Sequence, residues 1–255
     1  MPEMKRKHDA GPWAPPKAVV LESCEFPIVE GEVDGYKVLE LPRELRRLVL
    51  EGGAGIIRIN SLEIARLLPD YGGRASGSRH SLFLHMDHSH PATDARRYLV
   101  LSKDTNGARG GSTLVAARQA LEAFVAIGEA YLNDSGWRRM IGSERNYEKR
   151  FGPFLSEAAY HRCLDEEDGY ERVVAGEYGR ETNRGRELAV RAKILRYLIC
   201  GPTADVVMEE ILRKHRESFY EERWERGGVL ILDNLRVSHG RYGGNNPPLQ
   251  RNYCI

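Results

Sequence analysis

Five Gly-Gly pairs divide the sequence into short segments, and this punctuation constrains the fold more than any other feature. Glycine has no Cβ and therefore favours tight turns. Short β-rich runs lie between several of these turns, which is the pattern of a β-sandwich or a β-barrel. The predicted strands cover residues 17–21, 36–41, 55–60, 81–87, 97–102, 229–233, 235–239 and 249–255.

Helical segments interrupt this β pattern. Pro42 suits the first position of a short helix, since its missing N–H costs nothing there, and Ser61 is a good N-cap for another. Two longer segments repeat apolar residues at helical spacing. Residues 187–200 fit a buried strand about as well as a helix. The predicted helices cover residues 42–50, 61–68, 115–132 and 204–220.

Charge and composition exclude several classes of partner. The chain has 38 Lys and Arg residues against 37 Asp and Glu, so its electrostatics give no reason to expect nucleic acid or an anionic membrane. No apolar run approaches the roughly 20 residues of a membrane helix, and the N-terminal region lacks the apolar stretch of a secretory signal. The scattered cysteines show no metal-ligand spacing and fit a reducing cytosol. We therefore expect a soluble cytoplasmic protein, and the sequence leaves its oligomeric state open.

The 255 residues are predicted to form a single domain. Residues 1–16 are interpreted as a flexible N-terminal tail, and residues 17–255 as the domain itself. The segment 133–186 is polar, charged and rich in turn residues, so we interpret it as a lid or an insertion between two halves of a β core. Candidate ligands fall on both sides of this segment, which favours one domain over two.

A His-x-Asp pair at His85 and Asp87 is the first candidate for chemistry. Alternate strand residues share a face, so the pair can aim two ligands at one point. A lone His-x-Asp is weak evidence in a chain with eight histidines, but His239 supplies a second imidazole on a later predicted strand. Two imidazoles and a carboxylate suit non-haem ferrous iron and leave its other positions open. Arg251, on the following strand, can donate two parallel hydrogen bonds to a carboxylate.

These residues resemble the taurine dioxygenase-like (clavaminate synthase-like) branch of the iron(II)/2-oxoglutarate-dependent oxygenases. That family shows His-x-Asp, then Gly-Gly-x-Thr about 25 residues later, then a Trp-x-x-Gly-x-Val-Leu-x-x-Asp-Asn run leading to a distal His, and then an Arg. Here the same order is formed by His85-Met-Asp87, Gly110-Gly-Ser-Thr113, the run from Trp224 to His239, and Arg251. The matched segments extend from about residue 80 to the C-terminus.

The resemblance implies a mainly β fold with flanking helices, a double-stranded β-helix or jelly roll of the cupin type. It implies that His85, Asp87 and His239 bind Fe(II) as the catalytic centre, and that Thr113 and Arg251 bind the cosubstrate 2-oxoglutarate. The implied reaction consumes O₂, releases succinate and CO₂, and oxidises an unactivated C–H bond of a small molecule. Hydroxylation is the default outcome. Desaturation and ring closure begin from the same intermediate and stay open, because substrate placement decides between them.

The chain departs from the family at one substrate position. Many relatives carry a second arginine four residues after the first, where this chain has Ile255, so the taurine-type substrate site is not carried over. Halogenating relatives replace the carboxylate ligand with a small residue, and Asp87 argues against that reaction. The substrate residues are unknown; an amino acid or a similar carboxylate is the working hypothesis.

Two readings from other classes remain open. His88 and His90 follow the His-x-Asp pair, and such a cluster could serve a zinc hydrolase with zinc-bound water as the nucleophile. Strand alternation would turn both side chains away from His85, so a polar loop at the mouth of a pocket is the simpler interpretation. A non-catalytic binding module on the same fold would be expected to lose metal ligands, and none is lost.

Overall fold

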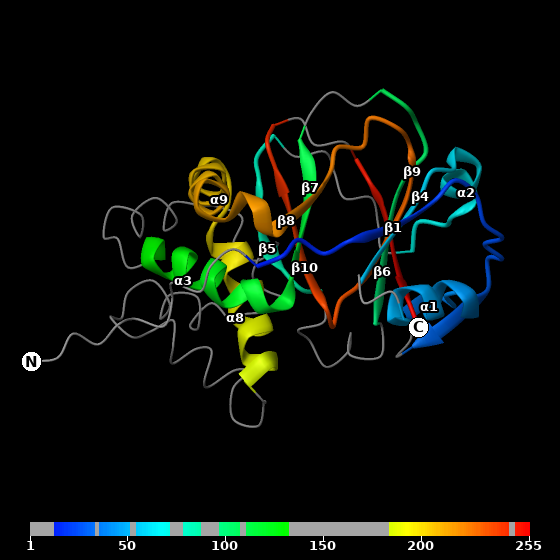
Figure 1. The fold of residues 1–255 in the computed structure, drawn as a ribbon, viewed down its shortest axis with the longest axis horizontal. Helices are drawn as coiled ribbons and strands as arrows, with labels where there is room; N and C mark the ends of the chain where they lie inside the picture. The colour runs from blue at the N-terminus through cyan, green and yellow to red at the C-terminus, as the bar shows by residue number, and fades with distance from the viewer. Residues whose placement is uncertain are drawn as a thin grey trace, which may run out of the picture.

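The computed structural model describes residues 13–33, 36–51, 55–71, 79–87, 97–107, 111–132, 184–244 and 248–255. Within these ranges, two β-sheets pack face to face, and helices cover the outer side of each sheet (Figure 1). Several predictions lie wholly or largely outside the described residues. They are the flexible tail as far as residue 12, the insertion from 133 to 183, the role of His88 and the role of His90.

The larger sheet has seven strands and is mixed. Strand β1 (Ala18–Leu21) pairs in parallel with β4 (Ile56–Ile59), and β11 (Gln250–Cys254) pairs in parallel with β3 (Tyr36–Leu39). The other neighbouring strands are antiparallel. The strands at its centre are buried throughout, which explains their nearly continuous apolar sequence. In spatial order they are β1 (Ala18–Leu21), β4 (Ile56–Ile59), β9 (Gly228–Asp233), β6 (Tyr98–Lys103), β11 (Gln250–Cys254), β3 (Tyr36–Leu39) and β2 (Glu30–Val33).

The smaller sheet is antiparallel and has four strands. Its neighbouring strands β7 (Ser112–Ala117) and β8 (Phe219–Glu222) come from segments far apart in the sequence. Asp233 ends β9 and stabilises the turn into β10 (Val237–Tyr242). Its Oδ1 accepts a hydrogen bond from the Leu235 N–H at 3.0 Å, and its Oδ2 accepts one from Arg97 Nη2 at 2.7 Å. The chain therefore crosses from one sheet to the other just before His239. In spatial order the strands are β5 (Leu82–His85), β10 (Val237–Tyr242), β7 (Ser112–Ala117) and β8 (Phe219–Glu222).

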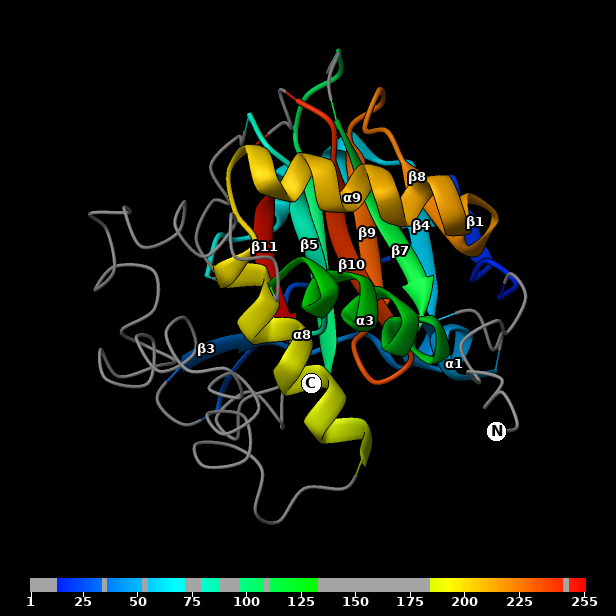
Figure 2. The same ribbon diagram turned by 90° about the vertical axis from the view of Figure 1, so that its left-hand side faces the viewer.

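Three long helices cover the outer face of the four-stranded sheet: α3 (Leu121–Leu132), α8 (Arg184–Leu198) and α9 (Pro202–His215) (Figure 2). They bury a core that includes Phe83 and Phe124. The outer face of the seven-stranded sheet is covered by α1 (Arg43–Glu51) and α2 (Leu62–Leu67). No helix in the described part of the chain has the length and apolar character needed to span a membrane.

The space between the sheets holds a third apolar cluster, which includes Leu101 and Leu230 from the larger sheet and Val115 and Val237 from the smaller one. This cluster identifies the strand faces that point inward. Because side chains alternate along a strand, residues two positions from these also face the interior.

The observed elements confirm the mainly β architecture with flanking helices. Ser61 is the N-cap of α2, and its Oγ accepts the Ile64 N–H at 3.3 Å. Pro42 lies one residue before α1 and accepts the Arg46 N–H through its carbonyl at 2.9 Å. Cys254 is buried in the core. The ambiguous segment 187–200 lies largely in helix α8.

Two helix predictions were wrong in part, and three strands were not predicted. Residues 115–117 belong to strand β7, which is buried on both faces, so its apolar run also fits helical spacing. The helix predicted to reach residue 220 ends at His215, and strand β8 begins at Phe219. The missed strands β2 and β8 are short and carry charged residues that obscure the alternation, and β7 was missed because its apolar end was assigned to the helix.

Candidate metal centre

His85 and His239 meet across two neighbouring strands. His85 ends β5, and His239 is its Cα partner on β10. Their ring centroids are 4.4 Å apart. Gly240, the next residue on β10, permits this approach, because a Cβ there would lie 2.6 Å from the Leu82 carbonyl oxygen of β5. The register of two strands thus brings together imidazoles from distant parts of the sequence.

Asp87 completes the group from just beyond the strand. It was predicted to continue the strand of His85, but β5 ends at His85 and Asp87 lies in a bend. Its Oδ1 lies 3.5 Å from His85 Nε2, and its Oδ2 lies 3.6 Å from His239 Nε2. One ligand atom from each of the three buried residues lies within 4.8 Å of the others. The three predicted metal ligands therefore converge.

A hydrogen bond orients the ring of His85. The Phe83 carbonyl oxygen lies 2.9 Å from His85 Nδ1, and a carbonyl only accepts, so Nδ1 carries the hydrogen. Nε2 is then left with its lone pair toward Asp87. This is the usual arrangement of a metal-binding histidine, whose other ring nitrogen donates to a carbonyl or a carboxylate.

The protonation states at this point suit a metal ion. Burial lowers the pKa of His85 well below its usual value, and the charges of Arg196 and His239 add to the effect. Burial likewise lowers the pKa of His239, to about 4, against the attraction of Asp87. Burial alone would raise the pKa of Asp87, but the charge of Lys193 holds it well below its usual range. At neutral pH the group is two neutral imidazoles and a carboxylate, the forms that bind metal.

Two cationic side chains of helix α8 approach the same carboxylate. Lys193 Nζ lies 2.8 Å from Asp87 Oδ1, and Arg196 Nη1 lies 3.5 Å from it. Residues three apart lie on one face of a helix, so both point to the site. Burial lowers the pKa of Lys193 to about 8, although Asp87 opposes the change. Sequence reasoning missed both residues because residues 187–200 could not be assigned to a helix.

Two further arginines face the interior from opposite sheets. Arg241 lies two residues after His239 on β10 and therefore shares its face. Arg251 on β11 is the Cα partner of Leu101, whose side chain lies between the sheets. Burial lowers the pKa of Arg241 to about 10, and the charges of Arg196 and Arg251 contribute. Arg241 was not predicted, although strand alternation from His239 would have found it.

Thr113 faces the same interior from strand β7. It is the Cα partner of Arg241, and it lies two residues from Val115, a member of the inter-sheet cluster. Its side chain is buried, and its Oγ1 accepts a hydrogen bond from the indole N–H of Trp224 at 2.9 Å. Of the predicted cosubstrate residues, Thr113 and Arg251 thus lie on facing sheets.

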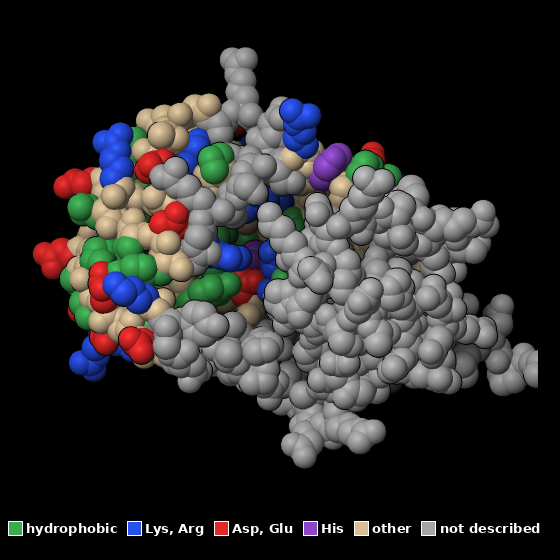
Figure 3. Space-filling model, turned by 180° about the vertical axis from the view of Figure 1, so that it is seen from behind, with side chains coloured by type: hydrophobic (Ala, Val, Ile, Leu, Met, Phe, Trp, Pro, Cys, Tyr) green, Lys and Arg blue, Asp and Glu red, His purple; other side chains and the backbone are tan. Residues whose placement is uncertain are grey.

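One face of the molecule shows a mixture of charged side chains. Seen from behind, basic, acidic and histidine side chains lie together near the middle of the molecule, between hydrophobic side chains (Figure 3).

Comparison with known proteins gave matches to solved structures. No family model and no curated protein matches the sequence. Similar structures include the non-heme iron oxygenase OrfP, at 16% identity, covering 84% of this chain and 81% of that chain, with a TM-score of 0.36. They also include PvcB from Pseudomonas aeruginosa, at 14% identity, covering 90% and 91%, with a TM-score of 0.33. Another structure of PvcB describes it as an Fe, α-ketoglutarate-dependent oxygenase from an isonitrile synthetic pathway. At these identities and TM-scores, the chemistry proposed below rests on the residues of this chain.

Proposed function

We propose that this protein is an iron(II)- and 2-oxoglutarate-dependent oxygenase of jelly-roll fold that oxidises an unactivated C–H bond of a small molecule. The observation that carries the proposal is the convergence of His85, Asp87 and His239 at one buried point. Two imidazoles and one carboxylate bind non-haem ferrous iron on one side and leave positions for other ligands. The two sheets packed face to face, with helices outside, support the jelly roll.

The residues present fit the metal. Neighbouring ligand atoms around an ion at about 2.1 Å should be about 3 Å apart. The separations of 3.5 and 3.6 Å between the imidazoles and Asp87 need only a small contraction. One oxygen of Asp87 can bind the metal while the carboxylate keeps its contact with Lys193. Lys193 would then act as an outer partner that orients the ligand.

The cosubstrate needs a metal at its 2-oxo acid end and a cation at its other carboxylate. Arg251 faces the interior from the sheet opposite the two histidines, and its planar guanidinium matches a carboxylate. Thr113 would add a hydroxyl donor. Bound iron, together with O₂ and 2-oxoglutarate, supplies the oxidising power and yields succinate and CO₂. Arg251 and Thr113 would orient the cosubstrate, while the buried surroundings exclude water.

A carboxylate-bearing substrate, such as an amino acid, fits the surroundings of the metal. Arg196 lies on α8 beside Asp87, and Arg241 lies on β10 beside His239, so both are close to where a substrate must approach. Neither is on the strand of Arg251, and the substrate can therefore be held by cations distinct from the cosubstrate arginine. Hydroxylation is the reaction we propose, with desaturation or ring closure as variants set by substrate position.

An anaerobic titration of the metal-free protein with Fe(II) and 2-oxoglutarate tests the proposal. The chelate of the two should produce a weak visible charge-transfer band that is diminished in Arg251→Ala. A screen for succinate release over amino acids and other small carboxylates would then identify the substrate. Absence of the band, with tight zinc binding at His85 and hydrolytic activity, would replace the oxygenase by a zinc hydrolase.

A further inference from the structure

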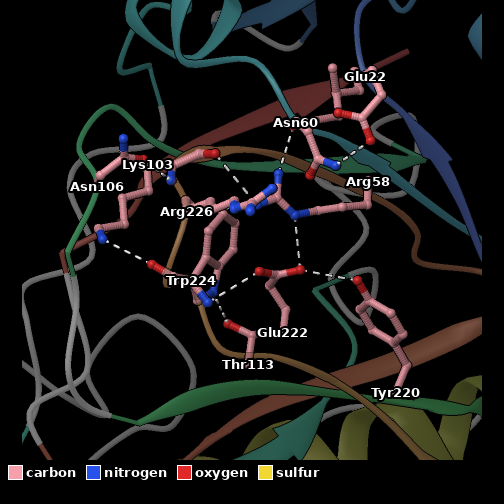
Figure 4. Close-up of polar contacts among 12 residues, drawn as sticks. Glu22, Arg58, Asn60, Lys103, Asn106, Thr113, Tyr220, Glu222, Trp224 and Arg226 are labelled. Atoms are coloured by element: carbon pink, nitrogen blue, oxygen red, sulfur yellow. Dashed lines mark hydrogen bonds and ion pairs between the residues drawn. The ribbon is translucent and has the colours of Figure 1, made fainter.

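Trp224 has an unusual backbone conformation. Its φ of 55° makes it the one non-glycine residue with positive φ among those the structure describes. The left-handed region costs an L-residue about 1–2 kcal/mol, so the surrounding structure must hold it there. The Trp224 N–H donates to Glu222 Oε1 at 3.1 Å, and its carbonyl accepts from Lys103 Nζ at 3.0 Å (Figure 4). These two side chains stabilise the backbone that aims the indole.

A buried ion pair supports this arrangement. Arg58 Nε donates to Glu222 Oε2 at 2.9 Å, and the Tyr220 hydroxyl donates to the same oxygen at 3.0 Å (Figure 4). The Arg58 guanidinium also lies 5.5 Å from the centre of the Trp224 ring, where the cation is attracted to the ring face. A Cβ at Gly228 would collide with this guanidinium, which explains one glycine of the 227–228 pair.

The indole controls the direction of the Thr113 hydroxyl. An indole N–H only donates, so in the 2.9 Å contact Thr113 Oγ1 must be the acceptor. The hydroxyl hydrogen is therefore directed away from Trp224. Within the described part of the chain this hydrogen has no recorded protein acceptor, and Thr113 is buried on the inward face of β7. A buried donor without a partner is costly, so a bound acceptor would satisfy it.

We infer that Trp224 is a positioning residue for the cosubstrate: its indole N–H orients the Thr113 hydroxyl to donate to the carboxylate of 2-oxoglutarate that Arg251 holds. The inference rests on the proposed function. Arg58 and Glu222 act one step further away, since they hold the strained backbone of Trp224. None of these three residues needs to touch the metal or the cosubstrate.

The variant Trp224→Phe tests this inference, because it keeps an aromatic ring and removes the N–H. The loss of one oriented hydrogen bond is expected to weaken 2-oxoglutarate binding to the iron-loaded protein about 3- to 10-fold in the anaerobic band titration. Turnover at saturating 2-oxoglutarate should change less than about twofold, since the bond is present both before and during the reaction. Trp13→Phe makes the same chemical change beside Phe124 and His215, outside the site, and should leave the affinity unchanged.

A double-mutant cycle separates positioning from a purely structural effect. In the Thr113→Val background, Trp224→Phe should cause no further loss of 2-oxoglutarate affinity, because the hydroxyl it orients is gone. Thr113→Ser keeps the hydroxyl and should restore sensitivity to Trp224→Phe. Independent, additive losses would overturn the inference.

A spectroscopic measurement covers the case in which Trp224→Phe does not fold. The indole N–H resonance of Trp224 should move when 2-oxoglutarate binds the zinc-loaded wild-type protein, and should not move in Thr113→Val. A resonance unaffected by the cosubstrate in the wild type would overturn the inference. If the wild type forms no charge-transfer band and releases no succinate, the proposed function fails. If the wild type forms the band and releases succinate, but Trp224→Phe binds 2-oxoglutarate as tightly as the wild type, only the inference about Trp224 fails.

Discussion

His85 and His239 are direct Cα partners on adjacent antiparallel strands, and their rings lie 4.4 Å apart in a buried space. Burial lowers the pKa of both imidazoles, and the charge of Arg196 adds to the effect at each of them. Their lone pairs are thus available at neutral pH. The pairing of two strands thus sets the position of a candidate metal site, and burial sets the protonation state of its imidazoles.

Loss of a metal ligand should abolish activity. His239→Ala and Asp87→Ala each remove one of three ligands, and Fe(II) affinity should fall by more than the about 10- to 100-fold that outer-shell changes cause. Iron-dependent succinate release should be lost in parallel. Fe(II) titration and turnover are the measurements, with His80→Ala, at a half-exposed histidine paired with Asp205, as the control. Full activity in either ligand variant would exclude the three-residue site.

Arg251 should determine the affinity for 2-oxoglutarate and not that for iron. A charged hydrogen-bonded pair contributes about 1.5–3 kcal/mol, so Arg251→Ala should weaken cosubstrate binding about 10- to 150-fold. Arg251→Lys should recover only part of this, since lysine cannot donate two parallel bonds. The charge-transfer titration measures both variants. If Arg251→Ala has no effect while Arg241→Ala abolishes the band, the carboxylate is held by Arg241.

The metal-free protein should lose stability on mild acidification. The pKa of His239 is about 4 in the folded state, against 6.5 for an ordinary histidine, because the ring is buried. Between these values the unfolded chain binds more protons, so the free energy of unfolding falls as the pH decreases from 6.5 to 4. The contribution of His239 is on the order of 3 kcal/mol. Urea unfolding across this window measures it. His239→Gln should flatten the profile, whereas a slope equal to that of the wild type would assign the effect elsewhere.

Gly240→Ala should disturb the metal site through the backbone. The added Cβ would lie 2.6 Å from the Leu82 carbonyl, so β5 and β10 must separate. We expect a loss of about 1–3 kcal/mol in unfolding free energy, together with weaker Fe(II) binding. Gly31→Ala on β2 is the matched control, since its Cβ would meet Val38 Cγ2 at an ordinary 3.4 Å. Equal effects of the two substitutions would remove the special role of Gly240.

Three residues that the sequence singled out lie together in the structure, whereas three of its strands were not predicted. His85, Asp87 and His239 were identified by spacing, and they converge because strand pairing places them in register. Strand alternation alone did not bring Asp87 to the site, since β5 ends before it. The helix wrongly extended over residues 115–117 shows that an apolar run buried on both faces carries no clear period.

The cationic residues around the site were harder to predict. Lys193 and Arg196 lie one turn apart on a helix that could equally have been a strand, so their common face was not visible in the sequence. The left-handed backbone of Trp224 depends on Glu222 and Lys103, a tertiary arrangement that no local pattern reports. Its position in the family motif marked Trp224, but not the contact it makes.

In the proposed complex the two sheets would share the cosubstrate, because the histidines and Thr113 belong to one sheet and Arg251 to the other. His85 and His239 belong to the four-stranded sheet, and Arg251 belongs to the seven-stranded sheet that faces it. Facing sheets are about 10 Å apart, and the side chains between them set that spacing. The apolar packing between the sheets therefore sets the distance between the metal ligands and the Arg251 guanidinium, and with it the length of the dicarboxylic acid that fits. A 2-oxo diacid one methylene shorter would reach either the metal or the guanidinium, but not both.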